Sequence, residues 1–410
     1  MNKIIFVANS GKRYRYYRLL AQRMKGSAQV ILSVYPSLAL LLGIFQPTPI
    51  DKNLLMASHL RRQKINYPML ARFPWLWRIY CYLAYVTERS RFHHYYQLFL
   101  KLDCEALGIW NGQKQPYLTM VKAAELAGKR VLFFENGLLP NTTTVDYMGV
   151  NAFNSLPRNA DFYLNLEQLP VTQSTIKLVK RDPHKKRQVS DQKLDNLNFN
   201  YIFIPFQVPA DSQIVIHSSW VHSMEQLFHL VRDARNKLML QGETKLPYLV
   251  FKEHPSWPGS FEHLYQLDEF CLFANENDTQ YLIEHANAVI TINSTVGLES
   301  LLLGKKVITL GNACYNIEQL VLHATNENEF FEAFASLPNW QYNEELRQKF
   351  INFIASVYWE GSDEDGDGNG IPDDWQQMLS QTSEAHLDAI YHRIFETDRL
   401  AQFIQLEKDR

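Results

Sequence analysis

A hydroxyl-bearing helix start follows a buried strand in the stretch AVITINSTVGLESLLLGKKVITL, residues 288–310. The β-branched run 288–292 predicts the strand, and Ser294 and Thr295 fall where the next helix begins. Backbone N–H groups and the helix dipole at such a position attract an anion. Glu299, one turn further along, could bind a ribose diol. Simple capping of the helix by the two hydroxyls is the alternative.

A second anion-binding candidate follows the predicted strand 248–251, where Lys252 and His254 stand in the sequence KEHP. An ammonium group and an imidazole just past a strand can neutralise a phosphate or a carboxylate. A lone histidine is more often structural, but its pairing with Lys252 favours a site. Strand 201–205 is also followed by a polar stretch, and we expect its residues Gln207, Asp211, Gln213 and Ser218 to bind substrate.

A long polar loop follows the predicted strand 131–134. It begins with Glu135, Asn136 and Gly137 and continues through Asp146 and Asn151. Loops placed after buried strands carry the chemistry of many α/β proteins. Glu135 and Asp146 are the only carboxylates of this loop, so they are its candidates for acid–base or nucleophilic work. A helix cap or structural hydrogen bonding is the alternative for each.

Strands alternate with helices along the chain. The predicted strands occupy residues 4–8, 30–34, 131–134, 201–205, 248–251, 288–292 and 307–310. This alternation predicts an α/β fold with parallel sheets that carry helices on their faces. Neither GxGxxG nor GxxxxGK[ST] occurs, so dinucleotide-binding and P-loop interpretations lose their main support.

Composition narrows the class of protein. A chain of 410 residues suggests two or three domains, and a net charge of −2 argues against a nucleic-acid-binding polycation. The four cysteines form no CxxC pair, which favours a reducing compartment and argues against zinc and disulfides. No apolar run approaches the roughly 18 residues of a membrane span. These features predict a cytoplasmic protein that could still lie on a membrane surface.

Residues 59–101 combine positive charge with aromatic side chains. This segment holds eight Lys or Arg residues, eleven aromatic residues and a single acid, Glu88. Such a pattern at helical spacing suits an anionic lipid surface. The alternative is a pair of ordinary helices whose aromatic residues pack in the core while the arginines stay solvated.

Two segments are predicted to stand apart from the domains. Residues 167–200 are rich in Lys and Arg and poor in large apolar residues, which predicts a linker. The stretch SDEDGDGNGIPDDW, residues 362–375, has calcium-loop spacing, but we prefer an acidic surface insertion because the segment is single and its expected compartment is poor in calcium. The calcium candidates are Asp363, Asp365, Asp367, Asn369 and Asp373.

Four motifs together resemble the bacterial capsule polysaccharide biosynthesis family: FFENGLLPNTTTVDYMGVNAFNSLPR, YIFIPFQVPADSQIVIHSSW, FKEHPSW and TINSTVGLESLLLGKKVITLGNACYN. The resemblance spans roughly residues 130–320 and is greatest to transferases that place the first β-Kdo on the lipid anchor of group 2-type capsules. It implies a GT-B glycosyltransferase, in which two Rossmann-like domains face a cleft and a C-terminal helix crosses back. The expected domains are 1–166 on the acceptor side and 201–340 for the nucleotide sugar, joined by linker 167–200 and followed by a helical tail, 341–410.

The resemblance also implies the reaction. CMP-Kdo would be the donor, and a capsule lipid of phosphatidylglycerol type or a Kdo-bearing molecule the acceptor. By motif order Asp146 is the expected nucleophile of a retaining transfer, and Glu135 orients the loop or assists proton transfer. One phosphate needs no metal when Lys252, His254 and the helix start bind it, so we expect no cofactor.

The expected partners are an anionic inner-membrane surface and other capsule synthesis or export proteins, with no nucleic acid among them. Three alternatives remain: a transferase for another CMP-sugar, a transferase with a polysaccharide acceptor, and a non-catalytic factor for capsule assembly or export.

Overall fold

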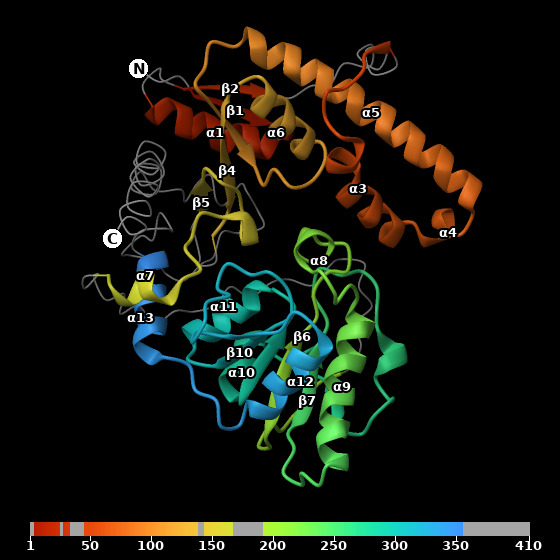
Figure 1. The fold of residues 1–410 in the computed structure, drawn as a ribbon, viewed down its shortest axis with the longest axis vertical. Coiled ribbons are helices and arrows are strands. Elements are labelled where there is room, and N and C mark those ends of the chain that lie inside the picture. Colours follow the sequence, from red (N-terminus) through yellow and green to blue (C-terminus); the bar gives the residue numbers. More distant parts are fainter. Residues whose placement is uncertain (1–3, 25–27, 33–44, 138–142, 167–191, 356–410) are drawn as a thin grey trace. The chain divides into compact units, whose positions relative to one another are not determined.

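The computed structural model describes residues 4–24, 28–32, 45–137, 143–166 and 192–355 (Figure 1). The calcium candidates of the 362–375 stretch, most of the predicted linker and the predicted C-terminal helix lie outside these residues. The chain divides into two compact units, with the boundary between Pro157 and Arg158.

The first unit is built on a five-stranded sheet in the order β2-β1-β3-β4-β5. Neighbouring strands are parallel except for β4 and β5, which pair antiparallel. Its strands are β1 (Ile4–Ala8), β2 (Ala28–Leu32), β3 (Ala106–Trp110), β4 (Arg130–Asn136) and β5 (Thr143–Asp146). Its helices are α1 (Gly11–Arg23), α3 (Lys52–Asn66), α4 (Pro68–Ala71), α5 (Pro74–Lys101), α6 (Tyr117–Leu126) and the 3-10 turn Asn151–Phe153.

Alternation along β1 and β3 feeds two cores, one on each face of this sheet. Phe6, Trp110 and Phe134 pack with Tyr16 and Tyr17 of α1 on one face. On the other face the packing residues are Ile5, Val7, Leu107 and Ile109 with Phe92 and Phe99 of α5 and Met120 of α6. Because both faces are covered, β1 and β3 are buried along their whole length, as expected of central strands in a parallel sheet.

The helices α3, α4 and α5 form an arm of the first unit (Figure 1). The second half of α5 packs on α6, and there Glu88 accepts a hydrogen bond from Thr119 and pairs with Arg91. The first half behaves differently, because Trp75, Ile79, Tyr82 and Leu83 are exposed together with Tyr67, Met69 and Phe73. The core-helix interpretation of residues 59–101 is therefore confirmed for the second half of α5, and the lipid-surface interpretation stays a prediction.

The second unit is built on a six-stranded, fully parallel sheet in the order β11-β10-β9-β6-β7-β8. Its strands are β6 (Tyr201–Pro205), β7 (Tyr248–Lys252), β8 (Cys271–Phe273), β9 (Ala288–Thr291), β10 (Lys306–Thr309) and β11 (Leu322–His323). Its helices are α7 (Ala160–Leu164), α8 (Ser212–His217), α9 (Met224–Leu240), α10 (Thr279–His285), α11 (Thr295–Leu302), α12 (Glu327–Ser336), α13 (Glu344–Phe353) and the 3-10 turn Glu262–Leu264. This strand order is that of a doubly wound Rossmann fold.

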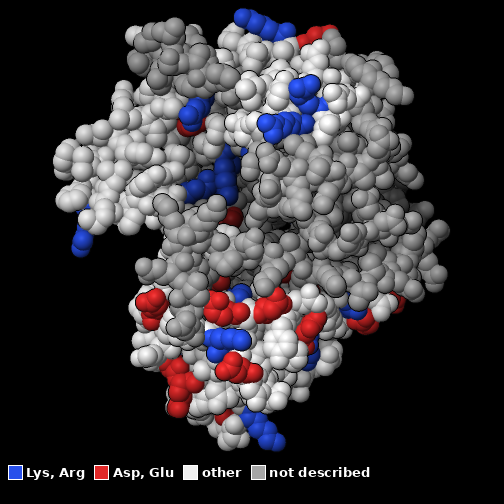
Figure 2. All heavy atoms as spheres, turned by 180° about the vertical axis from the view of Figure 1, so that it is seen from behind, with Lys and Arg blue, Asp and Glu red and all other residues white. Residues whose placement is uncertain are grey.

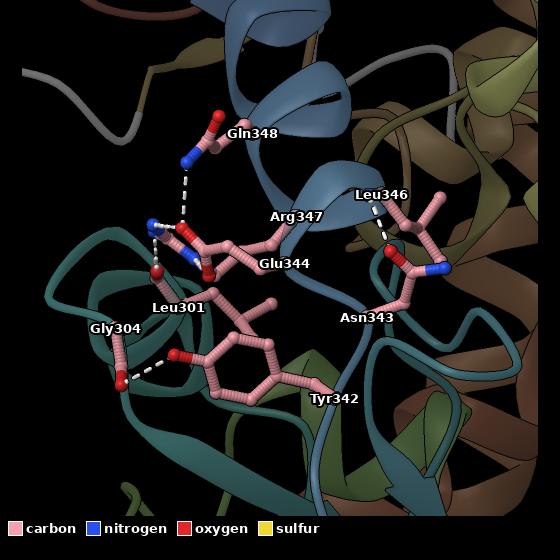
Figure 3. Close-up of polar contacts among 8 residues, drawn as sticks. All are labelled: Leu301, Gly304, Tyr342, Asn343, Glu344, Leu346, Arg347 and Gln348. Carbon is pink, nitrogen blue, oxygen red and sulfur yellow. Dashed lines mark hydrogen bonds and ion pairs between the residues drawn. The ribbon is translucent and has the colours of Figure 1, made fainter.

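Helix α13 is fixed to α11 by its first turn (Figure 3). Asn343 caps α13, Arg347 donates to the Leu301 carbonyl at 2.8 Å, and the Tyr342 hydroxyl donates to the Gly304 carbonyl at 2.8 Å. The far side of α13 packs on α7, where Phe350 meets Tyr163 edge to face. Helix α7 thus belongs to the second unit, although it precedes the predicted linker in the chain.

The α/β architecture predicted from the sequence, with two Rossmann-like units in one chain as in GT-B proteins, is confirmed. Among the described helices, none is long and apolar enough to cross a membrane. On the face shown in Figure 2, basic side chains predominate over the described surface of the first unit, whereas both signs of charge are interspersed over the second.

Candidate active site

The carboxyl ends of β6 and β9 define the switch point of the second sheet, because the chain leaves β6 toward β7 and returns to its other side at β9. Doubly wound sheets bind ligands in the crevice outside such a point. Gln207 follows β6, and Asn293, Ser294 and Thr295 follow β9. The residues predicted from the TINST motif therefore lie where this fold binds its ligands.

The helix start at Thr295 forms as predicted. Ser294 caps α11 by accepting from the Val296 N–H at 3.2 Å, and its own N–H donates to the Thr291 hydroxyl at 3.2 Å. The buried Tyr315 hydroxyl donates to the Ser294 carbonyl. Gly297 makes room for this contact, since a Cβ there would overlap the Tyr315 hydroxyl. Ser294, Thr295 and Glu299 are each partly exposed, so all three are accessible on this helix.

A buried amide pair lies beneath that helix start. Gln207 donates to the Asn293 side-chain oxygen at 3.1 Å and accepts the Asn293 N–H at 3.3 Å. The Asn293 side chain also donates to the Gln213 carbonyl at 2.8 Å and the His217 carbonyl at 3.3 Å. Gln207 was predicted to bind substrate. In this geometry it is buried and hydrogen-bonded to Asn293, so it supports the turn at Ser294 from beneath.

The other polar residues after β6 organise α8. Asp211 caps this helix by accepting the Gln213 N–H at 3.0 Å, and the buried Ser218 hydroxyl donates to the Val221 carbonyl. The Gln213 side-chain oxygen is buried without a partner among the described residues. His217 at the end of α8 is buried, and burial lowers its pKa to about 4, partly opposed by Asp211.

Lys252 and His254 lie at the end of β7, next to β6. The Lys252 ammonium donates to the carbonyls of Asn275 and Asn277, the first at 2.7 Å. The His254 Nδ1 accepts the Ser256 N–H at 3.1 Å, which in the neutral ring places the proton on Nε2. Between them Glu253 is buried and accepts from the Phe261 N–H and the Tyr265 hydroxyl. His254 is thus better placed than Lys252 to meet a phosphate.

In the first unit, Asp146 ends β5 and holds the loop that follows. One of its oxygens accepts the N–H groups of Met148 at 2.7 Å and Gly149 at 3.3 Å. The other accepts the N–H and the hydroxyl of Ser155, at 2.9 and 2.8 Å. The side chain is 1% exposed. The nucleophilic role predicted for Asp146 requires an accessible oxygen, so this geometry favours a loop-holding role.

Glu135 is the more accessible carboxylate of the same loop. It stands near the end of β4 and is half-buried, while Asn136 is exposed and Gly137 is half-buried. The Asn111 side-chain amide donates to Glu135 Oε2 at 2.6 Å, and the Asn136 N–H meets Oε1 at 3.0 Å. Asn151, which adopts a positive φ of 57°, lies further along the loop at the start of the 3-10 turn.

Asn111 and its neighbourhood were not predicted, because the sequence analysis assigned no strand to β3. The signal that could have found it is the run ALGIWNGQ, an apolar segment followed by Asn-Gly. Asn111 adopts φ 64° and Gly112 φ 74°, so the chain turns sharply as β3 ends. This turn aims the Asn111 amide at Glu135.

No group of three or more metal-ligating side chains occurs among the described residues. Because the 363–373 carboxylates lie outside those residues, the calcium question stays a prediction.

Comparisons with known proteins agree with this architecture. The family described as "Capsule polysaccharide biosynthesis protein" matches residues 167–352. Protein FixF of Sinorhizobium fredii is 33% identical over 317 residues, which cover 75% of this chain and 74% of FixF. The capsule polysaccharide export protein KpsS of Escherichia coli is 29% identical and covers 62% of this chain and 80% of KpsS.

Among solved structures, KpsC of Thermosulfurimonas dismutans, a β-Kdo 2,7-transferase, aligns with a TM-score of 0.49 at 13% identity, covering 93% of this chain and 98% of that one. Two Rossmann-like units in one chain are the architecture of the GT-B fold. The FixF similarity is extensive enough to assign the family, and this chain belongs to the capsule polysaccharide biosynthesis family.

Proposed function

We propose that this protein is a retaining glycosyltransferase that moves β-Kdo from CMP-Kdo to a capsule lipid anchor or a Kdo-bearing acceptor. The observation that carries the proposal is the capped, partly exposed start of α11 at the β6/β9 switch point. A helix N-terminus at a switch point suits the single phosphate of a nucleoside monophosphate sugar. Family membership supports the polysaccharide pathway.

The donor nucleotide would occupy the second unit. Its phosphate would lie at the N–H groups of α11 beside Ser294 and Thr295, and its ribose near Glu299. His254 would add a hydrogen bond from Nε2. Lys252, held by two backbone carbonyls, would act mainly by fixing the 275–277 loop.

Calorimetry with CMP tests the nucleotide site. His254→Ala should weaken CMP binding by about fivefold to tenfold, because one hydrogen bond to a charged group is lost. His285→Ala is the matched control, since His285 is exposed on α10 and, among the described residues, hydrogen-bonds to the Tyr281 carbonyl of its own helix. Unchanged CMP affinity in His254→Ala, Lys252→Ala and Thr295→Val together would remove the nucleotide site from this edge.

The two carboxylates of the first unit would have separate tasks. Glu135 would attack the anomeric carbon of Kdo, forming a carbon–oxygen bond while the bond to the phosphate oxygen breaks and CMP leaves with the electron pair. The acceptor hydroxyl would then bond to the same carbon, lose its proton to a base and release Glu135 as a carboxylate. Two inversions preserve the β configuration of the donor. Asp146 would hold the loop beside this reaction.

Intact-mass spectrometry distinguishes the two acids. Wild-type protein with CMP-Kdo and no acceptor should gain the mass of one Kdo residue. Glu135→Gln should abolish the adduct, and Asp146→Asn should retain some of it. An adduct that persists in Glu135→Gln and disappears in Asp146→Asn would return the nucleophile to Asp146.

Measuring CMP release from the same donor, with and without an acceptor, separates the rival functions. Release of CMP from CMP-Kdo, but only when a lipid acceptor is present, would indicate direct transfer without a covalent step. No CMP release with any acceptor would favour a non-catalytic assembly or export factor. Activity with a different CMP-sugar would keep the protein a glycosyltransferase but change its donor.

The arm of the first unit would hold the protein on an anionic membrane. Exposed aromatic and apolar residues from Tyr67 to Leu83 occur together with exposed cations, including Arg72 and Arg78. Apolar contact and positive charge are the two requirements of such binding, and each cation near the surface contributes about 1 kcal/mol.

Sedimentation with phosphatidylglycerol vesicles tests the arm. Replacing Arg72 and Arg78 with Glu, together with Trp75→Ser, should leave most of the protein in the supernatant. Arg62 is excluded from the test because it is buried. Arg15→Glu and Arg18→Glu, two exposed positions on α1, provide the control for net charge. If the arm variant and the control pelleted equally, the arm would not bind the membrane, and its exposed residues would be assigned to contact with another protein.

A further inference from the structure

The first unit has a switch point of its own, between β1 and β3. In the strand order β2-β1-β3-β4, the chain leaves β1 toward β2 and returns to the other side at β3. Helix α1 begins just after β1, and α6 begins shortly after β3. The fold therefore directs two helix starts and the turn at Asn111 to one edge of the sheet, the edge at which Glu135 also stands.

Arg13 in the first turn of α1 is held at this edge by two aromatic rings. Its guanidinium lies 5.3 Å from the ring centre of Trp110 and 5.4 Å from that of Tyr117. It also donates to the Tyr117 hydroxyl at 2.6 Å and to the Asn9 side-chain oxygen at 3.3 Å. Among the described residues, no carboxylate forms an ion pair with Arg13.

Such packing fixes the guanidinium without neutralising it. Cation–π contact on two rings and a hydrogen bond donated to a neutral hydroxyl orient the planar fork, while no carboxylate among the described residues compensates the positive charge. An arginine whose only role was to tie elements together would satisfy the same geometry with an acid. The arrangement is that of a receptor for an oxyanion.

Tyr17, one turn further along α1, supplies a second and independent observation. Its ring is fully buried, stacked on Phe6 with centres 4.9 Å apart and edge to face with Phe134 at 5.3 Å. Its hydroxyl is buried and has no hydrogen-bond partner among the described residues. Leaving such a hydroxyl unpaired costs about 1–3 kcal/mol, so an unpaired one points to a missing partner.

The Tyr17 ring lies beside the ring that holds Arg13, since the ring centres of Tyr17 and Trp110 are 6.5 Å apart. Burial raises the pKa of the Tyr17 hydroxyl, and Tyr16, Arg13, Tyr117 and Glu135 are the neighbouring groups whose charges act on it. Arg13 and Tyr17 therefore both contact Trp110, and Glu135 stands near the end of β4 at the same edge of the sheet.

We propose that Arg13, with the Tyr17 hydroxyl, binds the carboxylate of an ulosonic sugar while Glu135 attacks its anomeric carbon. This assignment rests on the proposed function, because the sugar is taken from it. The anomeric carbon of such a sugar carries the carboxylate directly. An approaching Glu135 oxygen is repelled by that charge, and a guanidinium on the sugar carboxylate removes the repulsion. The phosphate of a lipid acceptor is the other oxyanion with the same chemistry.

Binding of small anions to the full chain tests the site without any turnover. Free Kdo and glycerol phosphate are titrated separately by calorimetry into wild type, Arg13→Gln and Tyr17→Phe. Arg13→Gln should weaken Kdo binding about tenfold or more, since a charge-assisted pair is lost. Arg18→Gln is the matched control, an exposed arginine on the same helix.

Tyr17→Phe separates a binding role from a structural one. Removing an unpaired buried hydroxyl should leave the free energy of unfolding unchanged or higher, yet Kdo binding should weaken. Equal Kdo affinity in Tyr17→Phe and wild type would remove this hydroxyl from the site.

The outcomes decide the source of the anion. Glycerol phosphate binding that depends on Arg13, without any for Kdo, would overturn the sugar assignment in favour of the acceptor phosphate. Equal Kdo affinity in Arg13→Gln and wild type, or no binding of either anion to wild type, would overturn the site itself. Failure of the proposed function looks different, because Kdo would still bind through Arg13 while CMP-Kdo gave neither adduct nor CMP release.

Discussion

The two switch points of this molecule use polar groups in opposite ways. At β6/β9 the side chains of Gln207 and Asn293 and the ammonium of Lys252 bond to protein, and what they build is a backbone turn whose N–H groups start α11. At β1/β3 the guanidinium of Arg13 donates to uncharged groups and pairs with no carboxylate among the described residues, and the buried hydroxyl of Tyr17 has no hydrogen-bond partner there. The side chains of the β6/β9 edge hold backbone N–H donors in place, whereas at the β1/β3 edge the donors are the side chains of Arg13 and Tyr17 themselves.

The contrast predicts that substitutions at the β6/β9 edge act mainly on stability. Asn293→Ala should give the largest effect, because it leaves the Gln207 amide and the Gln213 and His217 carbonyls short of partners in a buried region. We expect the free energy of unfolding to fall by about 3–5 kcal/mol in urea titration. Asn312→Ala, at an exposed position after β10, is the control. A loss below about 1 kcal/mol would show that the frame is not rigid.

Low pH should lower the stability of the fold through His217 at the same edge. Its pKa is lowered by burial to about 4, so the unfolded chain binds a proton below pH 6.5 that the folded chain refuses until about pH 4. Stability should therefore fall as pH drops through this window, by at most about 3 kcal/mol from this residue. His217→Gln should flatten the slope of stability against pH between 6.5 and 4.5. An unchanged slope would assign the acid sensitivity to other histidines whose pKa is lowered by burial, such as the partly buried His59 and the buried His93.

At the loop beside the β1/β3 edge, Asp146→Asn should cost about 2 kcal/mol. An amide can replace only one of the two accepting oxygens, so one set of N–H donors meets an N–H group instead. Ser155→Ala removes a single hydroxyl bond from the same carboxylate and should cost about half as much. Denaturation curves for both variants provide the measurement. Full stability of Asp146→Asn would contradict the loop-holding role and favour catalysis.

A substitution with a small effect on stability tests the close packing at the start of α11. Gly297→Ala should destabilise by about 1–2 kcal/mol, because the new methyl group meets the Tyr315 hydroxyl and displaces it from the Ser294 carbonyl. In a Tyr315→Phe background the same change should cost less, since the overlapping oxygen is gone. Equal costs in both backgrounds would mean that the clash is relieved by moving the helix.

Sequence patterns predicted all but two of the described strands in each unit, and they missed β3 and β5 in the first unit and β8 and β11 in the second. The strand 288–292, the Ser294 cap and the end of the helix near Gly304, which has φ 68°, are local features, and the structure contains all of them. By contrast β3 was missed, because ALGIW is short and its neighbouring strands lie far away in the chain. The Arg13 site joins residue 13 to residues 110 and 117. No spacing in the sequence records such a contact, and only the sheet order brings it about.

The Asp146 assignment shows a further limit of sequence reasoning. Motif order identifies which loop carries a carboxylate. The sequence does not show whether that carboxylate is exposed or has all its oxygens hydrogen-bonded to its own loop. Glu135 and Asp146 differ in their surroundings, since Asp146 is closed over by Met148, Gly149 and Ser155. Accessibility is a property of the folded loop.

Helix α5 spans 28 residues, from Pro74 to Lys101, and its two halves have different neighbours. Trp75 is exposed near one end, while Phe92 is packed in the core that also contains Tyr117 of α6. At 1.5 Å per residue these two positions are roughly 25 Å apart along one rod. If the arm binds a bilayer as proposed, this length is the farthest that the rod could hold Phe92, and the core packed on it, from the membrane-binding end at Trp75. A lipid acceptor would have to span at most that distance, so the length of the helix would bear on which glycolipids can reach the site.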